Sequence, residues 1–306
     1  MIGVWTLNYP PERFIGSEMM THHLVKALIR SGAEVRAATT GTSNRWEFEG
    51  VRVTQDLTGC DVLITHADMP RLGWVHRIPK QVAVCHNLEA GVLLSMHNNR
   101  FALVVCNSDA MRAALEQREP QPYMVVRPPS PPLARLSRGE LVTVVNLNEN
   151  KVGRFWDIAR VLPEQGFLAV LGGYGEQVIP AMVPSNVEVL EHVPQHLMGE
   201  RVWSRTRLLL APSERESWNM TASEALAYGI STVTTDLPGV RENLGDTATY
   251  LDRDNLNGWV SAIVNAPRPS SQVQGRAQFN HDRHDADLTR FVKAVSDLGN
   301  DHSEAA

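Results

Sequence analysis

Two glutamates eight residues apart, Glu216 and Glu224, are the side chains of this 306-residue chain best placed to bind a polyhydroxylated anion. They lie in residues 211–245, where an apolar run is followed by a polar loop and then by a helix expected to begin near Asn219 or Met220. The start of a helix has free N–H groups and a partial positive charge, which suit a diphosphate. A carboxylate on each side of that start can accept hydrogen bonds from hydroxyl groups at the two ends of one ligand.

The same residues also allow a purely structural role for Glu224. The run from Thr221 to Glu224, TASE, matches the S/T-x-x-E capping box. In that motif the glutamate hydrogen-bonds to the backbone at the start of its own helix. From spacing alone, a ligand contact and a helix cap both stay open for Glu224.

The elements that must position this segment follow an alternating pattern. Amphipathic stretches separate short apolar runs, which predict strands near residues 1–7, 35–39, 61–65, 81–85, 103–106, 124–127, 141–147, 168–171, 187–190, 207–211 and 232–235. Such alternation is typical of an α/β fold with parallel sheets and crossover helices. Ligands of these sheets bind at the carboxyl ends of the strands, which is where the loop carrying Glu216 begins.

Four prolines within five residues mark a boundary in the segment RPPSPPLARLSRG, at 127–139. Proline has no N–H donor, so it continues neither a helix nor a central strand. The sequence therefore predicts an N-terminal domain over 1–130, a proline-rich linker over 131–138, a C-terminal domain over 139–280, and a last helix and tail over 281–306.

The composition is that of an ordinary globular protein, with 43 % hydrophobic and 21 % charged residues. No run approaches the roughly 18 consecutive apolar residues of a membrane span. The first residues lack the basic start and apolar core of a signal peptide, so a cytoplasmic location is expected. Three widely spaced cysteines predict neither a disulfide framework nor a zinc site.

The string ESWNMTASEALAYG, followed by TDLPGVRE, resembles the E-x7-E signature of retaining GT-B glycosyltransferases, specifically the large GT4 family. The resemblance implies two Rossmann-like domains. It also implies that Glu216 contacts the transferred sugar, that the intervening backbone holds the diphosphate and that Glu224 binds the ribose hydroxyls. The other residues that this resemblance assigns to the donor are Ser217, Trp218, Asn219, Met220 and Thr221.

Two further segments resemble parts of the same family. Gly16 and Ser17 take the place of a glycine-containing loop that approaches the donor phosphates, although Ser17 could equally be an ordinary N-cap. His86 follows an apolar run, at a point where a histidine of similar enzymes contacts the sugar or the leaving phosphate. An imidazole there can donate a hydrogen bond to developing charge, whereas the alternative is a structural histidine.

Lys151 occupies the lysine position of a segment that resembles the phosphate-binding pair of the family, an arginine followed five residues later by a lysine. The arginine position holds Asn146 instead. One cation neutralises less of a leaving diphosphate, so either a basic residue such as Arg154 compensates or donor binding is weak. Gly173, in LGGYG, is expected in a glycine turn near the nucleotide.

Two patterns that imitate metal sites are expected to be structural. Asp252 and Asp254 form a D-x-D pair outside the context that this motif requires. His281 and His284 have helical i, i+3 spacing without further ligands nearby, which favours a solvated helix face. No metal site is therefore predicted.

The resemblance implies transfer of a sugar from a UDP- or GDP-sugar to an acceptor hydroxyl, with retention of configuration, no cofactor and no obligate protein partner. Two alternatives stay open: a catalytically silent GT-B-like binding module, because of Asn146, and a nucleotide-sugar epimerase. Residues 1–135 carry 14 basic and 12 acidic residues, against 15 and 22 in the rest. Acceptors that stay possible are a small molecule, a glycan, a lipid-linked molecule or a modified nucleic acid.

Overall fold

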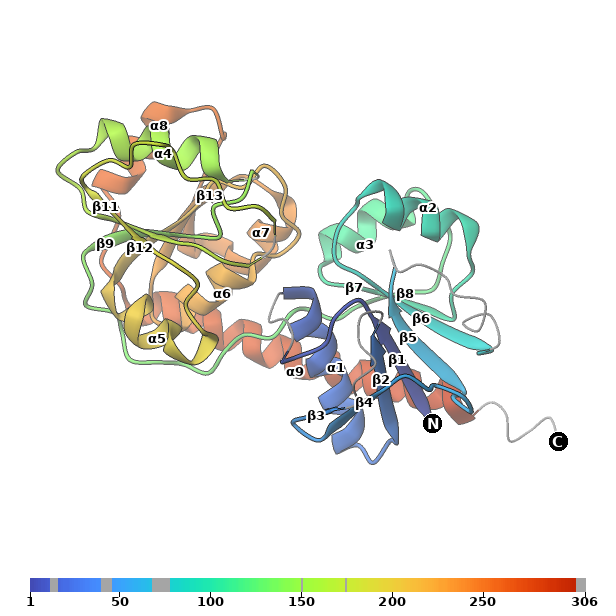
Figure 1. The fold of residues 1–306 in the computed structure, drawn as a ribbon. Coiled ribbons are helices and arrows are strands. Elements are labelled where there is room, and N and C mark those ends of the chain that lie inside the picture. Colours follow the sequence, from blue (N-terminus) through green and yellow to red (C-terminus); the bar gives the residue numbers. More distant parts are fainter. Residues whose placement is uncertain (12–15, 40–45, 68–77, 150, 174, 301–306) are drawn as a thin grey trace. The chain divides into compact units, whose positions relative to one another are not determined.

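A computed structural model describes residues 1–11, 16–39, 46–67, 78–149, 151–173 and 175–300 (Figure 1). The chain divides into two compact units. Unit 1 comprises Met1–Pro129 and Arg283–Ala306, and unit 2 comprises Ser130–Asp282. The predicted α/β class with parallel sheets is confirmed in both units.

In its described residues, unit 1 contains an eight-stranded sheet with the order β3-β4-β2-β1-β5-β6-β7-β8. All neighbouring strands are parallel except β3 and β4. The strands are β1 (Ile2–Thr6), β2 (Val35–Thr39), β3 (Trp46–Phe48), β4 (Val51–Thr54), β5 (Val62–His66), β6 (Lys80–Cys85), β7 (Leu103–Cys106) and β8 (Tyr123–Val125). Its helices are α1 (Gly16–Arg30), α2 (Ala90–Asn98), α3 (Asp109–Glu116) and the second part of α9 (Ser271–Asn300).

The sheet of unit 1 is covered on both faces. Successive side chains of a strand point to opposite sides, so neighbouring residues join different buried clusters. Val4 of β1 joins a core with α1 and the end of α9, where Phe291 and Val295 are fully buried. Its neighbour Trp5 joins a separate buried cluster on the other side. Burial on two faces explains why these strands read as continuous apolar runs.

Unit 2 contains, in its described residues, a six-stranded parallel sheet with the order β11-β10-β9-β12-β13-β14. The strands are β9 (Leu141–Val145), β10 (Phe167–Val170), β11 (Val187–Leu190), β12 (Thr206–Ala211), β13 (Ser231–Thr235) and β14 (Ala248–Leu251). The helices are α4 (Val152–Val161), α5 (Met198–Arg201), α6 (Met220–Ala227), α7 (Pro238–Leu244), α8 (Leu256–Val264) and the first part of α9, with 3₁₀ turns at Gln195–Leu197, Trp203–Arg205 and Gly245–Thr247.

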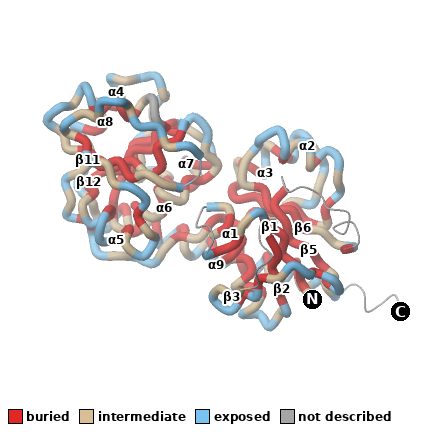
Figure 2. Tube along the Cα trace, in the orientation of Figure 1, coloured by how far each residue is buried: buried red, intermediate tan, exposed pale blue. Residues whose placement is uncertain are grey.

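The faces of this second sheet have different coverings. Leu208 and Leu210 of β12 belong to a core with α4 and α8, whereas Leu209 belongs to one with α6, α7 and α9. Within each unit, buried residues concentrate along the strands and exposed residues along the outer helices and turns (Figure 2). The helix that carries the second glutamate, α6, is therefore fixed on one face of the unit 2 sheet.

The proline-rich segment lies against unit 2 instead of forming a free connection. The N–H groups of Ala134 and Ser137 donate to the carbonyls of Ala227 and Tyr228, at 2.9 and 3.0 Å. The Ser137 hydroxyl also donates to the Thr206 carbonyl at 2.5 Å. The last helix is also longer than the expected 281–306 region, because it begins at Ser271 and its first part packs in unit 2.

Over the described ranges, no helix combines the length and the apolar character needed to cross a bilayer.

Gly139 should be intolerant of a side chain because a Cβ there would lie 1.8 Å from the carbonyl carbon of Arg205. Backbone cannot move aside cheaply, so Gly139→Ala is expected to lower the free energy of unfolding by about 1–3 kcal/mol. Gly275→Ala is the matched control, since it lies in α9 with nothing within 4 Å of the new Cβ. It should stabilise the protein by roughly 0.5–1 kcal/mol. Equal urea midpoints for the two variants would contradict this account of the packing.

Candidate functional site

The helix start expected between the two glutamates is present in unit 2. Strand β12 ends at Ala211, and α6 begins at Met220 after a loop. Asn219 is the N-cap: it has a left-handed backbone (φ 68°), and its Oδ1 accepts the N–H of Ala222 at 3.0 Å. Among the described residues, the N–H groups of Met220 and Thr221 have no recorded acceptor, as is usual at a helix start. Two amides are thus available to an anion.

The capping-box interpretation of Glu224 is wrong. The cap is Asn219, so Glu224 lies beyond the first turn of α6. Its carboxylate instead accepts hydrogen bonds from Gln195 Nε2 at 3.2 Å and Trp203 Nε1 at 3.3 Å. The physical reason is that the left-handed Asn219 is the N-cap, two positions earlier in the sequence than the Thr221 cap that the motif requires.

Partial burial makes the Glu224 carboxyl a weaker acid than usual. Desolvation raises its pKa from 4.5 to about 7, against a smaller lowering by its two hydrogen-bond donors. Ligand hydroxyls that donate to this carboxylate would favour the charged form and lower the pKa again. Sequence reasoning missed Gln195 and Trp203, which lie 29 and 21 positions before Glu224 and carry no motif of their own.

The loop before α6 is fixed by packing. The Trp218 side chain is only 2 % exposed, and its indole N–H donates to Ser223 Oγ at 3.2 Å. This indole therefore packs inside unit 2, and Trp218 can serve a ligand mainly through its backbone. A Cβ at Gly239, at the start of α7, would lie 1.9 Å from the Ser217 carbonyl oxygen. Glycine is thus required where α7 approaches the loop.

Lys151 and Glu216 interact electrostatically. Lys151 is buried just before α4, and its Nζ donates to the Val145 carbonyl at 3.2 Å. Burial lowers the pKa of Lys151, and the Glu216 carboxylate counteracts part of that effect. A buried ammonium group is stabilised by an added anion, so this lysine favours phosphate binding.

Asn146 is built into a glycine turn. It is buried with φ 62°, and its Oδ1 accepts a hydrogen bond from Gln177 Nε2 at 2.7 Å. Gln177 Oε1 in turn accepts the N–H groups of Leu147 and Gly172, at 2.9 and 3.2 Å. A Cβ at Gly173, where φ is 102°, would lie 3.0 Å from the Asn146 amide. Gly172, Gly173 and Gly175 all have positive φ, and the neutral Asn146 amide lies against Gly173.

Arg154, the residue that could compensate for Asn146 in the expected phosphate-binding pair, is paired with two carboxylates. Its guanidinium pairs with Asp254 at 2.9 Å and with Asp157 at 3.8 Å. Asp254 is thereby part of an ion pair, and Asp252 Oδ1 accepts the N–H of Asp254 at 2.8 Å. These contacts give the D-x-D pair structural roles. Among the described residues, no group of three or more His, Cys, Asp or Glu side chains is arranged to hold a metal ion.

Unit 1 brings Ser17 and His86 into one polar cluster. Helix α1 begins at Gly16, and the Ser17 hydroxyl donates to Glu18 Oε2 at 2.6 Å. The Thr21 hydroxyl donates to the Ser17 carbonyl at 3.0 Å and lies 2.8 Å from His66 Nε2. The rings of His66 and His86 meet edge to face, with centroids 4.8 Å apart. Burial, and then His66, holds the pKa of His86 well below 6.5, so His86 is neutral at neutral pH.

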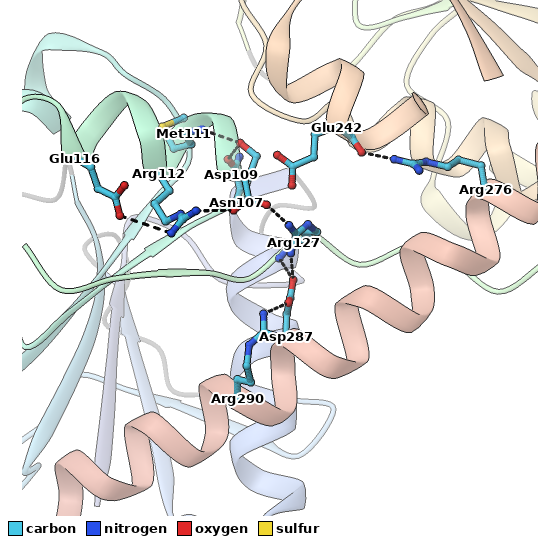
Figure 3. A network of polar contacts seen from close by, with 11 residues as sticks. Asn107, Asp109, Met111, Arg112, Glu116, Arg127, Glu242, Arg276, Asp287 and Arg290 are labelled. Atoms are coloured by element: carbon cyan, nitrogen blue, oxygen red, sulfur yellow. Dashed lines mark hydrogen bonds and ion pairs between the residues drawn. The ribbon is translucent and has the colours of Figure 1, made fainter. Parts of the chain in front are cut away.

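A second polar network in unit 1 was not expected from sequence (Figure 3). Arg127 lies two residues after the end of β8. Its guanidinium donates to Asp287 of α9 at 2.9 Å and also forms an ion pair with Asp109. The Arg127 carbonyl accepts a hydrogen bond from His284 Nδ1 at 2.7 Å. His284 is buried, so the expectation of a solvated helix face is wrong for this residue. An adjoining cavity of about 540 Å³ is lined by Asp109, Arg112, Tyr123, Met124, Val125, Arg127, Arg283, Ala286, Asp287 and Arg290.

Replacing Glu224 with glutamine should remove a pH-dependent loss of stability. The folded pKa of about 7 lies above the ordinary 4.5, so the folded state binds this proton more tightly than the unfolded chain does. The resulting stabilisation is present below pH 4.5 and is lost as the pH rises through 7. Urea unfolding between about pH 5 and pH 8 should therefore show a steeper fall for the wild type than for Glu224→Gln. Parallel pH curves would refute the assignment.

Residues 141–266, which include the whole loop and α6, match the sequence model of the family described as Glycosyl transferases group 1. No curated protein matches the chain significantly.

Solved structures are similar at low sequence identity. A sucrose-phosphate synthase from Thermosynechococcus elongatus has a TM-score of 0.75 at 14 % identity, covering 100 % of this chain and 99 % of that one. A trehalose-6-phosphate synthase has a TM-score of 0.68 at 9 % identity, covering 98 % and 99 %. Staphylococcus aureus TarM in complex with UDP, fondaparinux and α-GlcNAc-glycerol has a TM-score of 0.59 at 11 % identity, covering 78 % and 55 %. The chain thus has the GT-B fold, and its residues 141–266 match group 1 glycosyl transferases.

Proposed function

We propose that this protein is a retaining, GT4-like glycosyltransferase that transfers a sugar from a UDP- or GDP-sugar to an acceptor hydroxyl. The observation that carries the proposal is the start of α6. Two available amides, Met220 and Thr221, lie in sequence between Glu216 and Glu224, and buried Lys151 interacts electrostatically with Glu216. The crystallisation of the structurally similar TarM with UDP supports a nucleotide as part of the ligand.

Each group then has a distinct role in the donor site. The amides of Met220 and Thr221 and the Lys151 ammonium hold the diphosphate. The Glu224 carboxylate accepts hydrogen bonds from the ribose hydroxyls, and Glu216 contacts the transferred sugar. The glycine turn at Gly173 lies toward the nucleotide. No cofactor beyond the donor itself is needed for these roles.

Transfer in this proposal exchanges one bond of the anomeric carbon for another on the same face. The bond to the diphosphate oxygen breaks while the bond to the acceptor oxygen forms, and the acceptor proton passes to the leaving phosphate. Preorganised donors that face the leaving group stabilise its developing charge, which is commonly the largest catalytic contribution. We assign acceptor binding to unit 1, where Gly16, Ser17 and the neutral imidazole of His86 are candidate ligand contacts.

A catalytically silent nucleotide-sugar-binding protein is the second candidate. Asn146 favours it, because a neutral amide bonded to Gln177 replaces a cation in the expected phosphate-binding pair. A thermal-shift panel of UDP-, GDP-, ADP- and TDP-sugars identifies the donor, since ligand binding raises the melting temperature. Mass spectrometry of the stabilising donor, incubated with candidate acceptors, then separates the two functions. Transfer or slow hydrolysis supports an enzyme, and an intact donor supports a binding protein.

Substitution of the two glutamates should affect different steps. Glu224→Ala is expected to raise the donor Kd by about 10–100-fold, because hydrogen bonds to a charged group contribute about 1.5–3 kcal/mol. Glu216→Gln is expected to lower kcat by roughly 100-fold, as when one transition-state contact is lost, with a much smaller change in donor Kd.

Glu214→Gln is the matched control for these substitutions, because Glu214 is an exposed carboxylate of the same loop. Calorimetric titration of the donor and initial-rate kinetics give the two quantities. Unchanged Kd and kcat in both glutamate variants would remove the assignment of this loop to the donor.

A further inference from the structure

Asn243 of α7 is a buried amide that contacts the loop before α6 directly. Its side chain is 0 % exposed, and its Nδ2 donates to the carbonyl oxygens of Trp218 at 2.9 Å and Asn219 at 3.1 Å. Backbone carbonyls can only accept hydrogen bonds, so the group that faces them must be the amide NH₂. The same side chain exchanges a hydrogen bond with Ser223 Oγ in the second turn of α6.

The opposite side of Asn243 is held by α9, independently of the loop. Asn280 Nδ2 donates to both Asn243 Oδ1 and the Asn243 carbonyl, each at 2.9 Å. Arg276 Nε donates to the Asn243 carbonyl at 2.7 Å, and its guanidinium also bonds to the Glu242 carbonyl (Figure 3). All of these residues belong to unit 2. Asn243 therefore has a fixed position against which the loop can be held.

The loop needs such a support because of its backbone conformation. Asn219 has φ 68° and ψ 80°, a left-handed conformation that is uncommon outside glycine and that asparagine tolerates better than most other residues. Rotation of the peptide group between Asn219 and Met220 would redirect the Met220 N–H and, by displacing the start of α6, the Thr221 N–H that follows it. The hydrogen bonds from Asn243 to the Trp218 and Asn219 carbonyls oppose that rotation.

We infer that Asn243 is a positioning residue of the donor site: it fixes the peptide groups at 218–219 so that the amides of Met220 and Thr221 point toward the donor diphosphate. The inference rests on the proposed function of this loop. Asn243 has no assigned contact with the donor, so its effect reaches the ligand only through the backbone of α6.

The isosteric substitution Asn243→Asp tests this directly. It keeps the acceptor that faces Asn280 but replaces the donor NH₂ with an oxygen that faces two carbonyls. Loss of two buried hydrogen bonds should raise the Kd for the diphosphate probes UDP and GDP by about 10–100-fold in calorimetric titration. If this variant does not fold, Asn243→Ala removes the same donors without adding an oxygen and is expected to raise the Kd in the same range.

Asn280→Ala is the matched control. It removes the two hydrogen bonds from Asn280 to Asn243 and should lower the melting temperature, but it leaves in place the bond from Arg276 to the Asn243 carbonyl and the bonds from Asn243 to the loop. Its Kd for UDP and GDP is expected to stay within about threefold of the wild type. An equal rise in the Kd for UDP and GDP in both variants would show that Asn243 acts only through stability and would overturn the inference.

The outcome also separates this inference from the proposed function. Wild-type binding of UDP or GDP with an unchanged Kd in the folded Asn243→Asp variant would overturn only the positioning role. Absence of binding to the wild type would overturn both, because no diphosphate would then be held at α6.

Discussion

The first turn of a helix cannot satisfy its own N–H groups, and the start of α6 leaves this requirement partly unmet. Asn219 caps only the N–H of Ala222, which leaves the two preceding amides available. A protein can tolerate unpaired donors where a ligand or water reaches them. The surrounding structure must therefore hold the start of α6 in place and keep other protein groups away from these two amides.

Helix α9 contributes to both units by different parts of its length. Arg276 and Asn280 in its first part fix α7 and hence the loop before α6. In its second part, Phe291 and Val295 complete the core of unit 1, and Asp287 bonds to Arg127. A surface helix ordinarily serves one core. Here its 30 residues supply both apolar and polar contacts to each of the two units.

Local patterns predicted most of the strands, though not β3, β4 or β14, and the start of α6, because hydrophobic periodicity and the change from polar loop to helix are carried by adjacent residues. The capping-box alternative for Glu224 is excluded because Asn219 is the cap, although its left-handed backbone is not evident from residue types. The hydrogen-bond donors to Glu224 could not be predicted either, since Gln195 and Trp203 lie in two 3₁₀ turns that are distant from it in the sequence. The substitution at Asn146 was visible in the sequence, but its role in the glycine turn depends on a fold-level contact. Long-range hydrogen bonds, more than motifs, thus determine how this site is built.

The central claim is that the start of α6 holds the diphosphate of a nucleotide sugar, and a crystal structure of the protein with UDP or GDP bound tests it most directly. The account predicts the diphosphate oxygens within hydrogen-bond distance of the Met220 and Thr221 amides, with the ribose hydroxyls on Glu224. A nucleotide bound with its diphosphate away from α6, or with Glu224 still bonded only to Gln195 and Trp203, would contradict it.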